Sequence, residues 1–263
     1  MTADAASTSL PATARVPRRS GWRLRAAHAL YRVAIRLHWA EPELNGLEAV
    51  VRPGDTVLDI GAALGMYTVP LGDIVGPDGR VFSFEPQHRG VATVRLLRVL
   101  AGVRGGVTRR IALGPTAGHG HIAVPFLRGF PIFGHGHIAE GADDGSHRIH
   151  RSRTRIDTVD AWCATHALDR IAFIKIDVEG FEPAVVEGAR AVIDRDRPSL
   201  LLEIEDRHLV RYGRDAAGFL AEVHERWPEY RMHTWSGTTW VEVDRVEPST
   251  RNYLFATGDA LSR

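Results

Sequence analysis

The fold is decided by the stretch Val57-Leu58-Asp59-Ile60-Gly61-Ala62-Ala63-Leu64-Gly65-Met66-Tyr67-Thr68. It begins with a short apolar run, residues 56–60, that is typical of a buried parallel strand. Small residues follow, and a helical pattern covers residues 64–74. Gly61 and Gly65 let the backbone turn and let a ligand approach closely. The stretch therefore predicts a strand, a tight turn and a helix whose free N–H groups face the turn.

The glycine spacing in this turn bears on which ligand it suits. A dinucleotide site requires Gly-x-Gly-x-x-Gly, with the pyrophosphate at the helix N-terminus. Here the spacing is Gly61-x-x-x-Gly65, and the strand carries Asp59, whose carboxylate would repel a pyrophosphate. S-adenosylmethionine (SAM) has an amino group, a positive charge and no phosphate, so it suits the turn better. A plain strand-turn-helix with incidental glycines is the third interpretation.

A second strand that ends in an acid favours SAM. Residues 81–85 form an apolar run that ends at Glu85, followed by Pro86, which stops the strand. An acid at this place can accept hydrogen bonds from both hydroxyl groups of a ribose. Two carboxylate-ended strands around a small-residue turn therefore predict a SAM site.

Composition gives further limits. A chain of 263 residues has room for one large α/β domain with or without an extension. The formal net charge of +1 provides no overall field that would attract nucleic acid, so we expect no nucleic-acid partner. A single cysteine, Cys163, excludes an intramolecular disulfide and fits a cytoplasmic location. Lys175 is the one lysine among 33 basic residues.

The chain divides into three parts. Residues 1–20 are rich in Ala, Thr, Ser, Pro and Arg, which predicts a disordered segment. Residues 21–53 form an N-terminal helical extension, and residues 54–263 form the main domain with an insertion at about 114–153. The helix predicted over residues 21–39 is basic, so it either lies peripherally on the inner face of a membrane or packs on the edge of the domain. The pattern does not determine the oligomeric state.

The insertion follows a third strand, predicted over residues 107–113. Ala112 and Leu113 at the end of this strand are candidates to border the adenine of SAM. Residues 114–153 are rich in glycine and histidine and have no periodicity, so we expect a structureless wall or lid over the acceptor pocket. Its histidine pairs allow a metal site, although no cysteine joins them. One histidine, His137, is a candidate catalytic base.

The fourth strand, residues 171–176, carries the candidate catalytic groups. Lys175 lies in this buried strand, and Asp177 and Glu179 follow at its end. Alternation places Lys175 and Asp177 on the same face. We expect a helix from residue 157, another from 183 to about 194 and a third over 215–227. The last strands are expected at 199–205, 230–234, 239–243 and 252–256.

These motifs resemble the FkbM family of SAM-dependent methyltransferases. The resemblance covers about residues 54–205 and rests on motifs in the first half and in the second half of that range. The motifs of the first half are Asp59-Ile60-Gly61-Ala62 with Gly65 and Tyr67-Thr68, Phe84-Glu85-Pro86, and Ala112-Leu113-Gly114. Those of the second half are Asp157-Thr158-Val159-Asp160, Ile174-Lys175-Ile176-Asp177-Val178-Glu179-Gly180 with Glu182, Glu187, Gly188 and Ala189, and Arg197-Pro198 with Glu203. The family usually has Asn in place of Ala63, and an Asn in the helix after the second strand.

The resemblance implies a doubly wound, seven-stranded Rossmann-like α/β fold, with a mostly parallel sheet and an antiparallel last strand. It also implies O-methylation, often of sugar or polyketide hydroxyl groups. The acceptor is then a small molecule or a glycan. The residues expected to bind SAM are Asp59, Gly61, Ala62, Ala63, Gly65, Tyr67, Thr68, Glu85, Pro86, Ala112 and Leu113.

Asp177 and Glu179 are the first candidates to orient or deprotonate the acceptor, because such groups collect at strand ends in open α/β sheets. Lys175 either tunes them or forms a structural ion pair beneath the site. The same carboxylates could instead hold Mg²⁺, which prefers oxygen ligands. Two other functions stay open: a SAM-binding scaffold without catalysis, and a nicotinamide oxidoreductase.

Overall fold

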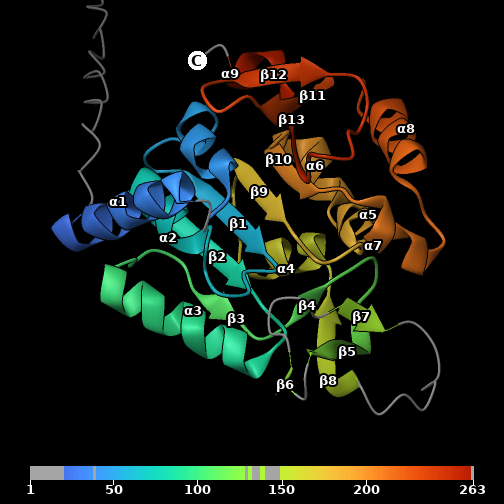
Figure 1. Ribbon diagram of the computed structural model, residues 1–263, viewed down its shortest axis with the longest axis horizontal. Helices are drawn as coiled ribbons and strands as arrows, with labels where there is room; N and C mark the ends of the chain where they lie inside the picture. Colours follow the sequence, from blue (N-terminus) through green and yellow to red (C-terminus); the bar gives the residue numbers. More distant parts are fainter. Residues whose placement is uncertain (1–20, 38–39, 128–129, 132–136, 140–148, 262–263) are drawn as a thin grey trace, which may run out of the picture.

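The structure, a computed structural model, describes residues 21–37, 40–127, 130–131, 137–139 and 149–261 (Figure 1). The predicted disordered segment, residues 1–20, lies outside this range, as does most of the histidine-rich stretch between residues 132 and 148. No helix in the described residues is long and apolar enough to cross a bilayer.

The main sheet has eight strands in the order β12-β11-β13-β10-β9-β1-β2-β3. Strands β10, β9, β1, β2 and β3 pair in parallel, while β13 runs antiparallel to both β10 and β11. The strands are β1 Thr56–Ile60, β2 Arg80–Phe84, β3 Thr108–Arg109, β9 Phe173–Ile176, β10 Ser199–Glu203, β11 Tyr230–Trp235, β12 Trp240–Val243 and β13 Asn252–Thr257. This confirms the doubly wound, mostly parallel sheet. The predicted hairpin of residues 230–234 and 239–243 is also confirmed, and its second strand, β12, is one strand at the edge beyond the seven of the predicted fold.

Helices cover both faces of this sheet. On one face lie η1 Pro42–Ala49 and α2 Thr68–Val75, with α1 Trp22–Arg36 and α3 His88–Ala101 packed around α2. On the other face lie α4 Val159–Thr165, α5 Glu182–Glu187, α6 Arg190–Asp196 and α8 Ala216–Arg226. The short α7 Asp206–Leu209 and η2 Val210–Tyr212 precede α8, and α9 Gly258–Leu261 follows β13. Figure 1 shows α1, α2 and α3 on one side of the view and α5, α7 and α8 on the other.

The side chains of β1 alternate between the two faces of the main sheet, so this strand contributes to the core on both sides. Leu58 and Ile60 belong to the core under α4, α5 and α8, while Val57 belongs to the core under η1 and α2. Asp59 points to the same side as Val57, because successive side chains in a strand alternate. An ionisable group is therefore placed at the end of the strand and inside the helical layer.

The segment after β3 forms a second sheet, which the sequence did not predict. Its strands are β4 Ala112–Leu113, β5 Gly118–Leu127, β6 Phe130–Pro131, β7 His137–Ala139 and β8 Ile149–Asp157, and β5 and β8 form a long antiparallel pair. The expected third strand over residues 107–113 is therefore two strands in different sheets, and the insertion is not structureless. The signal that was missed is a period of two in β8, where Arg153 and Arg155 are exposed and Thr154 is buried.

Three helix predictions also need correction. The helix expected from Leu64 starts at Thr68, because Ala63 and Gly65 keep positive φ values of 41° and 79°. The helix expected from residue 157 begins two residues later, at Val159. Thr158 caps it, because its hydroxyl accepts a hydrogen bond from the Ala161 N–H. The single helix predicted over residues 183–194 is two helices, since Gly188 breaks it where the backbone passes Gly114.

Gly61 fixes how closely the ends of β1 and β9 approach each other. Its φ is +82°, and a Cβ atom there would lie 1.8 Å from the backbone oxygen of Asp177. Both the left-handed conformation and the close contact exclude a side chain. The turn that follows β1 therefore lies directly against the turn that follows β9.

We expect Gly61→Ala to lower the free energy of unfolding by well over 2 kcal/mol, because it adds a steric clash to the ~1–2 kcal/mol cost of a left-handed residue. The matched control is Gly54→Ala, which has a φ of +90° but nothing within 4 Å of the added Cβ. Urea unfolding of both variants measures the difference. Equal losses would show that the contact with Asp177 imposes no constraint.

Candidate active site

A cavity of about 280 Å³ lies at the carboxyl ends of β1, β2 and β9. Residues on its main-sheet side come from these strand ends, and Ile122 and Ile138 of the second sheet lie across from them. The lining residues are Glu41, Asp59, Ile60, Gly61, Ala62, Ala63, Leu64, Met66, Tyr67, Phe84, Glu85, Pro86, Gln87, Ile111, Ala112, Leu113, Ile122, Ile138, Lys175, Asp177, Val178, Glu179, Phe181 and Arg251.

Asp59 lies at the end of the cavity nearest α2. Its carboxylate accepts a hydrogen bond from the Thr68 hydroxyl (2.5 Å), and Thr68 also contacts the Ser83 hydroxyl (2.9 Å). Burial raises the pKa of Asp59 to about 6, against the opposing effects of Thr68 and Lys175. A buried carboxylate of this kind favours a cationic ligand, since positive charge would offset the loss of hydration.

Glu85 holds the turn after β1. Its Oε2 accepts from the Ala63 N–H (2.9 Å) and its Oε1 from the Gln87 N–H (2.7 Å). Burial raises the pKa of Glu85 to about 7. Ala63 keeps a positive φ without being glycine, and the hydrogen bond to Glu85 helps to hold it there. Glu85 thus links the ends of β1 and β2 beside the cavity.

Lys175 is fully buried and lies among polar partners. Its Nζ donates to Asn252 Oδ1 (2.6 Å), lies 3.6 Å from Asp177 Oδ2 and sits 5.0 Å from the centre of the Tyr67 ring. Desolvation opposes the charged form, but Asp177 and nearby glutamates outweigh it and raise the pKa of Lys175. The ammonium group therefore stays charged beneath the cavity.

Glu41 completes this side of the site from outside the sheet. Its Oε2 accepts from the Tyr67 hydroxyl (2.5 Å) and from Asn252 Nδ2 (3.0 Å). Tyr67 thereby faces both an anion and the Lys175 cation. Glu41, Asn252 and Arg251 were not predicted, because they come from a loop before η1 and from the start of β13, far from the strand-end motifs.

Asp177 and Glu203 carry opposite pKa shifts. Burial raises the pKa of Asp177 well above its ordinary value, with Lys175 opposing and Glu203 adding to the rise. Burial also opposes ionisation of Glu203, but His208, Lys175 and Arg251 outweigh it and hold its pKa at about 2. Asp177 thus keeps a proton to higher pH than a free carboxyl group, while Glu203 stays ionised.

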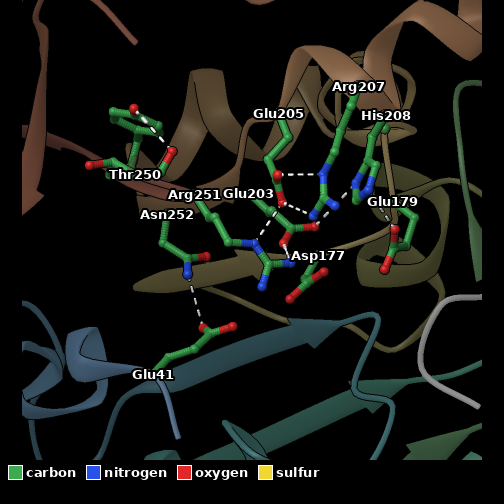
Figure 2. A network of polar contacts seen from close by, with 12 residues as sticks. Glu41, Asp177, Glu179, Glu203, Glu205, Arg207, His208, Thr250, Arg251 and Asn252 are labelled. Atoms are coloured by element: carbon green, nitrogen blue, oxygen red, sulfur yellow. Dashed lines mark hydrogen bonds and ion pairs between the residues drawn. The ribbon is translucent and has the colours of Figure 1, made fainter. Parts of the chain in front are cut away.

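A row of buried polar side chains connects Glu203 to the cavity through His208. His208 Nε2 lies 3.1 Å from Glu179 Oε2, and its Nδ1 lies 3.8 Å from Glu203 Oε2. Arg251 pairs with Glu203 from the other side. Figure 2 shows Glu203 between Arg251 and His208, with Glu179 beyond the imidazole. No sequence pattern pointed to His208, which follows the fifth strand in the short helix α7.

This donor set does not fit the predicted Mg²⁺ site at Asp177 and Glu179. Cationic groups or an imidazole already face both carboxylates: Lys175 faces Asp177, and His208 faces Glu179. Within the described residues, the grouping whose ligand atoms lie close together is Glu179, Glu203 and His208, and it omits Asp177. In that grouping one ligand atom of each residue lies within 4.8 Å of the others, and the two carboxylates face different nitrogens of His208.

One protein-family model matches most of the chain. The model of the methyltransferase FkbM domain matches residues 59–229, which is more than half of the sequence. The chain belongs to the FkbM methyltransferase family. No curated protein matched the sequence.

Solved structures similar to this FkbM-family chain include other methyltransferases. An FkbM methyltransferase from Methylobacillus flagellatus is 18% identical, over 90% of this chain and 56% of that chain, with a TM-score of 0.45. A SAM-dependent methyltransferase from Aquifex aeolicus is 14% identical, over 87% and 96%, with a TM-score of 0.45. Fibrillarin from Aeropyrum pernix, solved with bound SAM, is 13% identical, over 78% and 67%, with a TM-score of 0.41. The chain thus spans little more than half of the first of these, and the fold assignment rests on strand order and the family model.

Most of the predicted site residues come together in the FkbM-family chain. The cavity is lined by nine of the residues expected to bind SAM, namely Asp59, Gly61, Ala62, Ala63, Tyr67, Glu85, Pro86, Ala112 and Leu113, and by Lys175, Asp177 and Glu179. Gly65 and Thr68 lie outside the lining, and Thr68 acts through Asp59. His137 lies in β7, opposite Ala123 of β5, and its side chain is outside the described part of the structure.

The buried acids make stability depend on pH. Burial raises the pKa of Asp59 to about 6 and of Glu85 and Glu182 to about 7. In the folded state these carboxyl groups keep protons that the unfolded chain releases at roughly pH 4–5, the ordinary pKa range of Asp and Glu. Their contribution is therefore fully present below that range and is lost as pH rises through 6 and 7.

We expect the free energy of unfolding to fall between about pH 5 and about pH 8, with Glu85 contributing on the order of 2–3 kcal/mol of that fall. Glu85→Gln should flatten the dependence by this amount, because the amide does not titrate. Urea unfolding at about pH 5, 6, 7 and 8 measures this pH dependence. The exposed Glu222→Gln is the control for loss of a carboxyl group. An unchanged slope in Glu85→Gln would contradict the raised pKa.

Proposed function

We propose that this protein transfers the methyl group of SAM to a hydroxyl group on a sugar, glycolipid, polysaccharide or polyketide-type product. The observation that carries the proposal is one cavity that joins Asp59 and Glu85 to Asp177 and Glu179. The first pair suits a cofactor with a cationic group and a ribose, and the second suits a polar acceptor. Family membership supports methyl transfer as the reaction class.

Asp59 and Glu85 are the residues that would hold SAM. Asp59 offers a buried carboxylate to its positive charge, and Glu85 is placed to accept hydrogen bonds from ribose hydroxyls once a ligand competes with the Ala63 and Gln87 N–H groups. Gly61 keeps the turn free of side chains where the backbone is closest to β9. When bound, SAM supplies the methyl group that replaces the proton of the acceptor hydroxyl.

Glu179 is the group we assign to take the hydroxyl proton. It lines the cavity, and the imidazole of His208 holds one of its oxygens. Glu203 lies on the far side of the imidazole, with its Oε2 3.8 Å from His208 Nδ1, and Arg251 pairs with Glu203. Asp177, which keeps its proton to higher pH, orients the acceptor by hydrogen bonding. Buried Lys175 balances the negative charge of Glu41 and Glu203.

The opposite wall favours an acceptor with an apolar part. Ile122 and Ile138 come from the second sheet, and Phe181 comes from the turn before α5. All three are buried hydrophobic residues. A hydroxylated molecule that also carries an alkyl or ring surface would bury that surface here, worth roughly 25 cal/mol per Å².

Calorimetric titration with SAM, NADH and NADP tests the cofactor. We expect heat with SAM only, and at least a tenfold loss of affinity in Glu85→Ala, because two ribose hydroxyls lose their acceptor (about 1.5–3 kcal/mol). The exposed Glu222→Ala serves as the control. Heat with a nicotinamide cofactor and none with SAM would contradict the proposal.

Transfer of a labelled methyl group to hydroxylated glycans and polyketides tests the catalytic assignment. We expect Glu179→Gln to lower kcat by about 10²–10⁴ with SAM affinity retained, because a general base contributes that much. His208→Gln should lower kcat less and shift the pH profile, since His208 acts through Glu179. SAM binding without turnover on any hydroxylated acceptor would instead support a non-catalytic scaffold.

A further inference from the structure

Helices α1 and α3 present an unusual combination of charge and apolar surface, away from the site described above. Residues 5–40 contain seven arginines and no Asp or Glu, although the whole chain has a formal net charge of +1. Residues 86–139 likewise contain no acidic residue, and α3 lies within them. Of the described residues, α1 carries four arginines and α3 carries three, one of them the buried Arg98, and neither helix has an acidic residue. Positive charge therefore collects on the side of the molecule where Figure 1 shows α1 and α3.

Helix α1 has two apolar faces. Leu24, His28 and Tyr31 point inward to α2 and α3, and His28 pairs with Asp73 of α2 (2.7 Å). The second apolar set, Trp22, Ala26, Leu30, Val33 and Leu37, is exposed and repeats every three or four residues. With 3.6 residues per turn, this set forms one stripe on the opposite side of the helix. A helix that only packed on the domain would need one apolar face.

Arginines flank the exposed stripe. Arg23 lies along one edge of the stripe, and Arg25, Arg32 and Arg36 lie along the other, at the spacing that a helix imposes. Arg32 forms an exposed ion pair with Glu48 (3.2 Å), an interaction that a stronger anionic partner could replace at little cost. Trp22 is 72% exposed and Leu30 is 70% exposed.

Helix α3 extends the same surface. Leu96, Val99 and Leu100 of α3 are exposed, and Arg89 and Arg95 lie beside them. An apolar groove of about 500 Å³ runs between the two helices, with Trp22 and Leu30 on one side and Leu97 and Leu100 on the other. Exposed apolar side chains and arginines thus belong to one continuous surface built by two helices, which we term the α1–α3 surface.

We propose that the α1–α3 surface binds an anionic lipid bilayer, with the exposed apolar stripe in the interfacial layer and the flanking arginines on lipid headgroups. Exposed Trp and Leu beside arginines match the chemistry of that interface. A second copy of the chain is disfavoured, because a symmetric contact would bring arginines against arginines. Nucleic acid would account for the arginines but not for the exposed apolar stripe.

Flotation of the full chain with phospholipid vesicles tests this proposal. We expect binding to vesicles with about 30% phosphatidylglycerol, weak binding to pure phosphatidylcholine, and loss of binding as salt rises from about 0.1 M to about 0.5 M. Arg23→Gln with Arg36→Gln should weaken binding at least tenfold, because each arginine near an anionic surface contributes about fivefold. Leu30→Ser should weaken binding at both salt concentrations.

Matched controls separate this surface from general charge and hydrophobicity. Arg245→Gln and Val210→Ser change exposed residues elsewhere and should leave vesicle binding unchanged. Thermal unfolding of each variant checks that it is folded, and the salt series on the unaltered chain tests the proposal even if a variant is not. The proposal is overturned if the unaltered chain does not float with anionic vesicles, or if the arginine variant binds as well as the controls do. It is also overturned if Leu30→Ser abolishes a dimer, or if the surface prefers DNA to vesicles.

Discussion

The charge on one fully buried lysine side chain organises the candidate site. Lys175 has no exposed surface, and its ammonium group faces Asp177 and Asn252. An unpaired charge at this depth would cost several kcal/mol (roughly), so its partners are required for the fold itself. Because Asn252 also binds Glu41, and Glu41 binds Tyr67, the lysine ties the loop before η1, the turn after β1 and the start of β13 to one point.

The ends of β1, β9 and β10 meet beside Lys175 only because their backbones approach one another very closely. Gly61 contacts the backbone of Asp177, and Gly180, at a φ of +99°, contacts the backbone of His208. Glycine at both positions allows the ends of β1, β9 and β10 to converge, and this convergence places Glu179 against His208. The acid–imidazole chain is thus a consequence of backbone packing as much as of the side chains themselves.

The sequence predicted those parts of the site that lie at strand ends. Asp59, Glu85 and Asp177 each follow an apolar run, so periodicity placed them at one edge of the sheet. Glu41 and Arg251 lie in loops and His208 lies in the short helix α7, and their positions depend on tertiary packing that no local pattern encodes. The second sheet was missed for a different reason: the glycines in β5 have low strand propensity, and pairing with β8 overrides it.

Net charge illustrates how a correct total can mislead about its distribution. A formal charge of +1 suggests a surface without a strong field. The structure instead places acids such as Asp59, Glu85 and Glu203 in the interior and leaves many arginines at the surface, with α1 and α3 carrying several and no acid of their own. Some of the acids that cancel the arginines in the total are buried among their own partners, and those acids neutralise the outer surface only weakly. Local charge on a nearly neutral chain is thus set by which residues the fold buries.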